Sequence, residues 1–383
     1  MSTMIDSDQH LVEYRDLWSD HADPGLGDDA LRFVDDAVGN TWLRWREHEI
    51  GLADVQAPRA TTDIGERHQR ARRGEPPAQH YDDLLPRDHW DPAARAETVR
   101  TMGFDQAIMF PNYGLLWERT LSTSLPALTG NMRAWNRWCV EARVEGRGAL
   151  HPVGHVTLRD LDWLDAELAA LSAGDIRVAM VAPGLVDGKP PSHPDLDRAW
   201  SSFVAHGITP VFHVADQIRP FDDAWYHDRA EAFVPVLDSV FLYTAAALAC
   251  TDLIVHGVLD RHPDLRLGIV ELSAVWVPMF LMMLDGGVDF TTRLNGFAPA
   301  PLELRPSEYF RRQVRVSSFA YELPARLARQ LGGDDLLMAC SDYPHSEGTA
   351  TPLDDYAAGR FAVSPDTAPA LFADNAAFLL HQD

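Results

Sequence analysis

The sequence has few of the features that mark nucleic-acid-binding or membrane proteins. Lysine is almost absent: Lys189 is the only one in 383 residues, and the formal net charge is −24. This charge argues against nucleic acid or an anionic membrane surface as a partner, because both attract basic proteins. The apolar stretches near Ala245 and Val275 are interrupted by charges or prolines well short of the ~20 residues that a membrane-spanning helix needs.

Cysteine is also scarce. Cys139, Cys250 and Cys340 are odd in number and far apart, which excludes a disulfide framework. The first residues contain neither a basic segment nor a long apolar one, so we expect no secretory signal and a cytoplasmic location. The remaining composition, 46% hydrophobic and 23% charged, is that of an ordinary globular protein.

Short β-branched segments alternate with amphipathic helical segments along most of the chain. Helical patterns occupy 158–173, 195–206 and 243–261, the last of which ends before Pro263. Eight strands that alternate with helices indicate parallel pairing through crossover connections, and a closed arrangement of this kind is a (β/α)8 TIM barrel. We therefore predict an α/β protein with a distorted barrel and one domain spanning 1–383. The predicted strands are 4–11, 106–111, 150–156, 176–182, 209–215, 265–272, 314–319 and 336–343.

Two segments exceed the length of normal barrel loops. Residues 14–95 follow the first predicted strand and residues 216–240 follow the fifth. Both lie where β-to-α loops would lie, on the barrel face that carries active sites. We interpret them as insertions that cover a small-molecule substrate and contribute oligomer contacts. The alternative is disorder, against which the tryptophans in both segments argue.

Chemically reactive side chains stand at the ends of several predicted strands. Asp8 and His10 are two residues apart, so they point to the same face of the first strand. His213 ends the fifth strand, Glu271 the sixth and Asp342 the eighth. A buried carboxylate is costly unless it is paired or bound to a metal. Since the carboxyl ends of barrel strands meet at one mouth, this set predicts a divalent metal site.

Several motifs together resemble the amidohydrolase 2 branch of the amidohydrolase superfamily, which is similar to aminocarboxymuconate semialdehyde decarboxylase. The resemblance covers nearly the whole chain from the first strand to about residue 350. Its most specific part is the segment Ser-Asp-Tyr-Pro-His at 341–345. The other matching segments are 8–13, 90–92, 210–213, 261–265, Glu271 and 276–278.

The resemblance implies one divalent metal bound by Asp8, His10, His213 and Asp342. Zinc is the ion we expect, with Mn²⁺ or Fe²⁺ as alternatives. Asp342 would also take a proton from metal-bound water, and His345 would orient substrate or carry a proton. The alternative for His345 is a surface loop histidine.

One position departs from the family pattern. The well-studied decarboxylases of this branch have a catalytic histidine where this chain has Glu271. A glutamate beside a cation stays ionised and serves better as a base or an extra ligand than as a proton donor. We therefore predict a hydrolase that uses metal-activated water on an amide, ester, lactone or thioester. Catalysis would rest on Asp342, Glu271 and His345.

Two other functions stay open at this point. One is a non-oxidative decarboxylase of an aromatic or unsaturated carboxylate, and the other is a non-catalytic binding barrel. The abundance of tryptophan favours a bulky apolar substrate, and the resemblance suggests a homodimer. The candidate substrate-binding residues are Asn112, Tyr113, His155 and Trp276.

Overall fold

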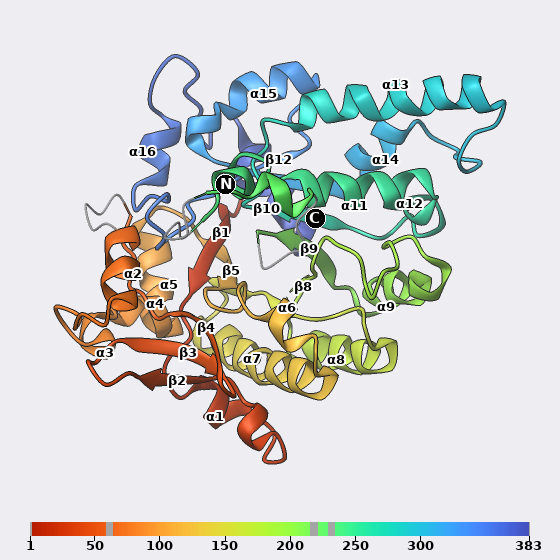
Figure 1. Cartoon of the computed structure of the whole chain (residues 1–383). Helices are drawn as coiled ribbons and strands as arrows, with labels where there is room; N and C mark the ends of the chain where they lie inside the picture. The colour runs from red at the N-terminus through yellow and green to blue at the C-terminus, as the bar shows by residue number, and fades with distance from the viewer. Residues whose placement is uncertain (1, 59–63, 215–220, 229–233, 383) are drawn as a thin grey trace.

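The computed structural model describes residues 2–58, 64–214, 221–228 and 234–382, and its centre is a ring of parallel strands (Figure 1). One sheet pairs β1, β5 and β6, and a second runs in the order β12-β11-β10-β9-β8-β7. The strands of the ring are β1 (Ile5–Leu11), β5 (Gln106–Pro111), β6 (Leu150–Pro152), β7 (Gly154–His155), β8 (Val178–Met180), β9 (Thr209–His213), β10 (Leu267–Val270), β11 (Val314–Ser318) and β12 (Leu337–Ala339).

Two junctions close the ring. β6 and β7 follow each other with only Val153 between them, so they form one barrel strand with an interruption. At the other junction, the backbone N–H of Asp342 donates to the carbonyl of Asp8 (2.9 Å) and that of His10 donates to the carbonyl of Tyr343 (2.8 Å). The predicted distorted (β/α)8 barrel is therefore confirmed.

Helices surround the barrel, and capping residues determine where several of them begin and end. The Asp91 carboxylate caps α5 by accepting from Ala94 N–H, and the left-handed Gly207 (φ 61°) ends α9. The longer helices are α2 (Ile64–Arg72), α5 (Pro92–Thr101), α7 (Leu125–Glu145), α8 (Leu161–Ala173), α9 (Asp197–His206), α11 (Thr244–Val255), α13 (Val277–Asn295), α14 (Pro306–Gln313) and α15 (Pro324–Leu331). The shorter ones are α1 (Leu17–His21), α3 (Tyr81–Leu84), α4 (Arg87–Trp90), α6 (Glu118–Leu121), α10 (Val236–Val240), α12 (Val258–Arg261), α16 (Pro352–Tyr356) and α17 (Asn375–Leu379).

One predicted helix is divided in the structure. The helical pattern of 243–261 forms α11 and α12, with a break at His256 and Gly257. Gly257 adopts a left-handed backbone (φ 74°), which a continuous right-handed helix excludes. Within the described ranges, no helix has the length and apolar character needed to cross a membrane.

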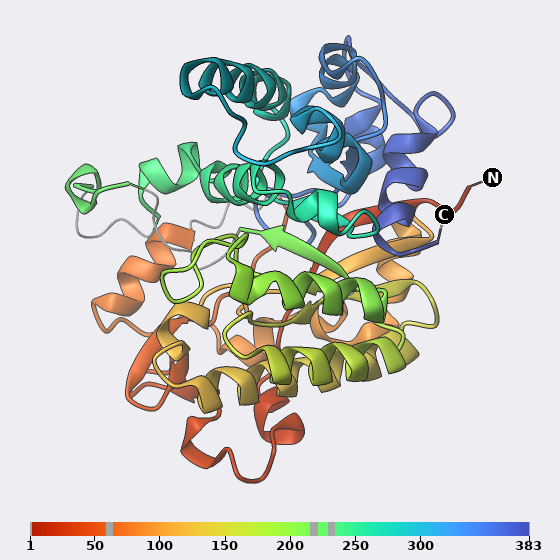
Figure 2. The ribbon, with the colours of Figure 1, turned by 90° about the vertical axis from the view of Figure 1, so that its right-hand side faces the viewer.

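Apolar side chains fill the barrel interior, and the end of the chain covers one of its openings. Ile108, Val211 and Met338 form a buried cluster with Ala376 and Leu379 of α17. The Thr209 hydroxyl donates to the Leu379 carbonyl (2.7 Å), which ties α17 to β9. The two termini lie on the same side of the molecule (Figure 2).

The first insertion has its own secondary structure. It contains an antiparallel sheet of β2 (Arg32–Asp35), β3 (Thr41–Trp45) and β4 (His48–Leu52), followed by α2, α3 and α4. Trp42 and Trp45 are buried within the described part of this insertion. The described part of the second insertion includes a 3₁₀ turn over Asp223–Trp225 and the helix α10.

Candidate metal centre

The reactive side chains predicted at the strand ends gather at one barrel mouth. Asp8 and His10 come from β1, His213 ends β9, Glu271 follows β10, and Asp342 lies three residues after β12. All but Glu271 have no exposed surface, and the Glu271 side chain is 13% exposed. The barrel therefore holds carboxylates and imidazoles together in a space that is almost closed to water.

The distances are short enough for a shared ion. His10 Nε2 lies 3.4 Å from Asp8 Oδ1, 3.3 Å from Asp342 Oδ1 and 3.4 Å from Glu271 Oε2. His213 Nε2 lies 3.5 Å from Asp8 Oδ1 and 3.1 Å from Glu271 Oε2.

The potential ligand atoms form two overlapping groups. Asp8, His10, His213 and Glu271 make one group, and His10, Glu271, Asp342 and His345 make the other, each with its ligand atoms within 4.8 Å of one another. Glu271 belongs to both groups. The predicted set of four is thus brought together, with Glu271 between its members.

The hydrogen bonding of these residues fits a cation. His10 Nδ1 lies 3.0 Å from the Pro111 carbonyl and His213 Nδ1 lies 2.8 Å from the Val214 carbonyl. A carbonyl oxygen accepts only, so Nδ1 carries the proton in both rings and Nε2 offers a lone pair. Both Nε2 atoms are buried without a hydrogen-bond partner, and the same holds for Asp8 Oδ1 and Oδ2, Glu271 Oε2 and Asp342 Oδ2. Buried polar atoms left unpaired in this way are the expected mark of a metal site.

The charges in the cluster act on one another. Burial raises the pKa of Glu271, and the nearby Asp342 and Asp8 carboxylates add to this effect against the opposing His213 and His10. Burial alone would lower the pKa of His10, but the carboxylates of Asp342, Asp8 and Glu271 raise it well above 6.5. Three carboxylates facing two imidazoles make this site one that favours a bound cation.

His345 connects the cluster to the loop after β5. Its Nδ1 lies 2.7 Å from Asp342 Oδ1, and its Nε2 lies 2.9 Å from Asn112 Oδ1. Burial opposes a charge on His345, yet the Asp342 carboxylate leaves its pKa raised, and the same pairing keeps the pKa of Asp342 below its usual range. His345 is 7% exposed, so the alternative of a surface loop histidine is wrong.

The two carboxylates at the ends of β10 and β12 are held on unusual backbone. Glu271 (φ 54°) and Asp342 (φ 55°) both adopt the left-handed conformation, which is uncommon outside glycine. A side chain at Gly348 would meet the Asp342 carbonyl oxygen at 2.3 Å, so the following loop packs closely against Asp342. Strain of this kind concentrates at functional sites.

The site is held in place by three further buried carboxylates, which the sequence analysis did not identify. Asp6 accepts from Ser341 N–H (3.0 Å) and Gln9 Nε2 (2.9 Å), and burial raises its pKa to about 7. Glu13 accepts backbone N–H groups of the loop that starts at Asn112. Glu322 accepts a hydrogen bond from the hydroxyl of Ser273 (2.5 Å), which lies two residues after Glu271 in the chain. The strand pairing shifts between Asp6 and Gln9, so simple alternation does not predict the contacts of Asp6, and Glu13 and Glu322 act through loops that no local pattern predicts.

A cavity of about 680 Å³ opens above the cluster and reaches Glu271 and His345. Of the four predicted substrate-binding residues, Asn112 and Tyr113 line it, while His155 and Trp276 do not. His155 is buried, with its Nε2 3.1 Å from Glu118 Oε2, and Trp276 Nε1 donates to the Leu272 and Ser273 carbonyls. Strand position suggested His155 and the abundance of tryptophan suggested Trp276, but packing directs both side chains elsewhere.

Both insertions contribute to the walls of the cavity. Figure 2 shows α10 and α2 on the same side of the molecule, away from the termini. The wall combines apolar side chains with charged and polar ones, among them Asp54, His68 and Arg119. Its apolar members include Ile50, Leu52, Ile64, Leu115, Leu116, Val214, Phe221, Val234, Leu237, Phe241 and Leu242.

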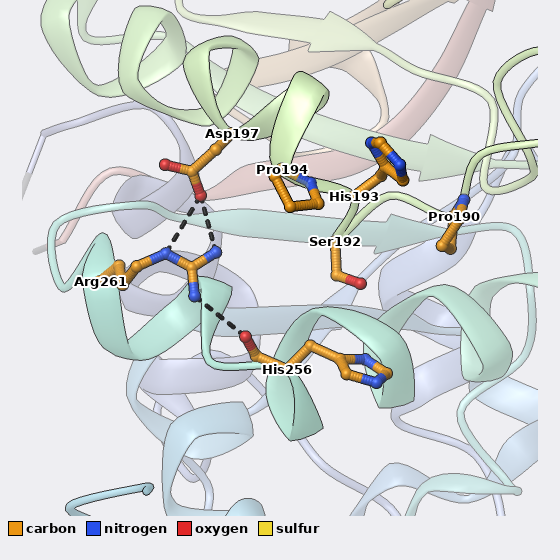
Figure 3. A pocket seen from close by; sticks show the side chains of 7 residues that line it. All are labelled: Pro190, Ser192, His193, Pro194, Asp197, His256 and Arg261. Atoms are coloured by element: carbon orange, nitrogen blue, oxygen red, sulfur yellow. Dashed lines mark hydrogen bonds and ion pairs between the residues drawn. The ribbon is translucent and has the colours of Figure 1, made fainter. Parts of the chain in front are cut away.

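A second hollow, of about 580 Å³, lies between the start of α9 and the end of α11–α12 (Figure 3). Its Arg261 is paired with Asp197 at 2.7 Å and also donates to the His256 carbonyl at 2.9 Å. None of the clustered metal-binding side chains lines it. The chemistry is thus concentrated at the barrel mouth.

Comparisons with known proteins agree with this architecture. The model of the amidohydrolase family matches residues 5–382. Among curated protein sequences, no relative matches the chain. An amidohydrolase from Mycobacterium avium subsp. paratuberculosis K-10 has a similar structure, with 21% identity, a TM-score of 0.76 and 99% of each chain covered.

Two solved decarboxylases are also similar over their whole length. The 5-carboxyvanillate decarboxylase from Sphingomonas paucimobilis has 15% identity and a TM-score of 0.64, with 100% of this chain and 99% of that chain covered. The enzyme of the same name from Novosphingobium aromaticivorans, solved with manganese, has 16% identity and a TM-score of 0.64, with 99% and 96% covered. At these identities the likeness establishes the barrel fold. Since the family model spans the barrel and all the clustered residues, this chain belongs to the amidohydrolase family.

Proposed function

We propose that this protein is a metal-dependent enzyme that removes carbon dioxide, without oxidation, from an aromatic or unsaturated carboxylate. The observation that carries the proposal is the buried cluster of unpaired carboxylate and imidazole atoms at the floor of a cavity lined by both apolar and polar side chains. A divalent ion bound there would coordinate the substrate carboxylate and a neighbouring oxygen. It would also draw electron density from the carbon–carbon bond that breaks.

The ligands would be the four expected from the sequence, Asp8, His10, His213 and Asp342, with Glu271 as a further one. Glu271 Oε2 approaches both imidazole Nε2 atoms within 3.4 Å, which is where a ligand atom belongs. Oxygen and imidazole donors suit Zn²⁺ and Mn²⁺ alike. We propose one divalent ion and leave its identity to metal analysis.

The proton handling would fall to His345. It lines the cavity, contacts Asp342 through one ring nitrogen and Asn112 through the other, and so has a fixed orientation. As the carbon–carbon bond breaks and carbon dioxide leaves, the ring carbon needs a proton, and His345 would donate it. The Asp342 carboxylate would stabilise the protonated imidazole of His345, and after donating its proton the imidazole would take another from water.

The position of Glu271 bears on the choice between decarboxylation and hydrolysis. As a free base it would favour hydrolysis, but its distances of 3.4 Å and 3.1 Å from the Nε2 atoms of His10 and His213 support the role of a ligand. The support for decarboxylation is this position together with the whole-length similarity to two enzymes named as decarboxylases. Hydrolysis of an amide, ester, lactone or thioester is the second candidate, since the Asp342–His345 pair is equally suited to accept a proton from water.

The cavity supports a substrate larger than a single benzoate ring. A volume of about 680 Å³ lies within the range of sites for drug-sized ligands. Its walls come largely from 14–95 and 216–240, so we propose that these insertions select the substrate and cover it.

The test is a comparison of two products from one metal-loaded enzyme. Hydroxylated aromatic carboxylates of increasing size should release carbon dioxide, and Asp342→Asn should abolish the release while leaving the circular dichroism spectrum unchanged. A parallel panel of esters, lactones, amides and thioesters in ¹⁸O-labelled water tests hydrolysis. Label in the acid product, with no carbon dioxide from the first panel, would replace the proposal with the hydrolase.

A further inference from the structure

Asp54 is a carboxylate of the first insertion that lines the cavity and takes no part in the metal cluster. It follows β4 and precedes α2 (Figure 1), and its side chain is 11% exposed. Its Oδ1 pairs with Arg67 Nη1 at 2.9 Å, whereas its Oδ2 is buried without a hydrogen-bond partner. A buried oxygen without a donor is costly, so a bound molecule that supplied one would gain affinity.

The neighbours of Asp54 do not complete its hydrogen bonding. Arg67 approaches through Nη1 alone, and this nitrogen also donates to the Val55 carbonyl (2.9 Å). His68 Nε2 lies 3.9 Å from Asp54 Oδ2, which is beyond hydrogen-bonding distance. Burial raises the pKa of Asp54 to about 6 against the opposing charge of Arg67. This is the behaviour of a carboxylate that has lost water and gained too few donors in return.

The backbone around Asp54 is fixed to the loops that carry the metal cluster. Asp54 N–H donates to the Tyr113 hydroxyl (3.0 Å), and this hydroxyl lies 3.1 Å from the Asp54 carbonyl. Two residues later, Gln56 Oε1 accepts from the N–H of Ser346, which follows His345 (3.1 Å). Asp54 therefore has a defined place on the cavity wall beside the proposed catalytic loop.

The surroundings of Asp54 indicate the kind of group that it would bind. A second carboxylate on the ligand would be repelled, and a methyl group would leave Oδ2 unsatisfied. Arg67 already supplies one positive charge at 2.9 Å, so a cation is not needed for balance. A neutral donor, a hydroxyl or an amide N–H, matches the site best, because it adds a hydrogen bond and no charge.

We infer that Asp54 is a specificity-determining residue that accepts a hydrogen bond from a neutral donor on the substrate. The inference rests on the proposed function in that the substrate is held by its carboxylate at the metal centre. It narrows the substrate class to carboxylates whose body carries a hydroxyl or an amide N–H on the side facing the first insertion. Substrates with an apolar group at that point would be rejected.

Matched pairs of ligands test the inference without turnover. The probes are biphenyl-4-carboxylates with a hydroxyl or a methyl group at the 2′, 3′ or 4′ position, titrated calorimetrically into the Mn²⁺-loaded full-length enzyme. At least one hydroxyl isomer should bind ~10–100-fold more tightly than its methyl partner, as expected for a hydrogen bond to a charged acceptor. Asp54→Ala should reduce this ratio to about 1, and Asp54→Asn, whose amide oxygen still accepts, should retain part of it.

The ratio separates recognition from a general disturbance of the fold. Both members of a pair share the carboxylate and the metal, so a structural defect would weaken them equally. Asp82→Ala is the control, because it removes an arginine-paired carboxylate of the same insertion that does not line the cavity. Its ratios should equal those of the wild type.

Three results would overturn the inference. They are equal binding of every hydroxyl and methyl pair by the wild type, a hydroxyl preference that survives in Asp54→Ala, and no binding of any probe. A wild-type preference that Asp54→Ala removes supports the inference even if the enzyme releases no carbon dioxide from any carboxylate. Failure of this subsite and failure of the proposed reaction are therefore distinguishable.

Discussion

Each imidazole of the cluster has one nitrogen hydrogen-bonded to a backbone carbonyl, and this contact prepares the other nitrogen for a metal. The Nδ1 of His10 and of His213 contact the carbonyls of Pro111 and Val214. Such partners fix the tautomer and the ring orientation of a ligand histidine. The site is therefore organised by backbone atoms before any ion arrives.

Replacing His213 tests directly whether the cluster binds a metal ion. His213→Ala should lower metal affinity by more than the ~10–100-fold that loss of an outer partner costs, because a ligand itself is lost. Metal content after gel filtration, measured by mass spectrometry, checks this. His256→Ala, which removes an exposed histidine at the C-terminal end of α11, is the control. Equal metal content in both variants would locate the ion elsewhere.

His151 gives a prediction for pH that is independent of the metal. Burial and the charge of Arg143 lower its pKa from 6.5 to about 3. Below pH 6.5 the unfolded chain binds a proton that the folded chain does not, so stability is present above this pH and is lost as the pH falls towards 3. His151→Gln should reduce the loss of unfolding free energy between pH 7 and 5.5 by about 1 kcal/mol. Denaturant titrations of both proteins give this difference, and parallel pH curves would contradict it.

At the scale of elements, the loop after β12 sets the position of Asp342. Ser341 N–H donates to Asp6, Thr349 N–H donates to the Ser341 carbonyl, and Gly348 packs on the backbone between them. The loop is thereby joined to β1, whose Asp8 and His10 face Asp342. Two elements from opposite ends of the chain meet at this junction.

A methyl group at Gly348 should disturb this junction. Gly348→Ala would bring Cβ to 2.3 Å from the Asp342 carbonyl, so we expect destabilisation of about 1–3 kcal/mol and a loss of bound metal. Gly184→Ala is the control, since a Cβ there meets nothing within 4 Å. Thermal melts and metal analysis of the two variants separate the effects. If Gly348→Ala retained wild-type metal content, the loop would not be what positions Asp342.

For the molecule as a whole, the ion should contribute to the stability of the barrel. The cluster joins the ends of β1, β9, β10 and β12, so a cation there links four strands around the ring. At free metal 100 times the Kd, binding adds about 2.7 kcal/mol. Chelation should therefore lower the Tm by several degrees, and Mn²⁺ or Zn²⁺ should restore it. A Tm that neither chelation nor metal addition changes would show that no ion links these strands.

The sequence by itself determined the barrel and most of the cluster that we propose as the metal site. Strand and helix periodicity is local, and charges at the ends of apolar strands are costly unless they meet, so Asp8, His10, His213 and Asp342 could be identified before the fold was seen. Only the tertiary structure decided that Glu271 lies between both imidazoles and that His345 is buried against Asp342. The physical reason is that these contacts depend on left-handed backbone and on the register of distant strands, while the directions of His155 and Trp276 depend on packing, and none of these is a property of a short segment.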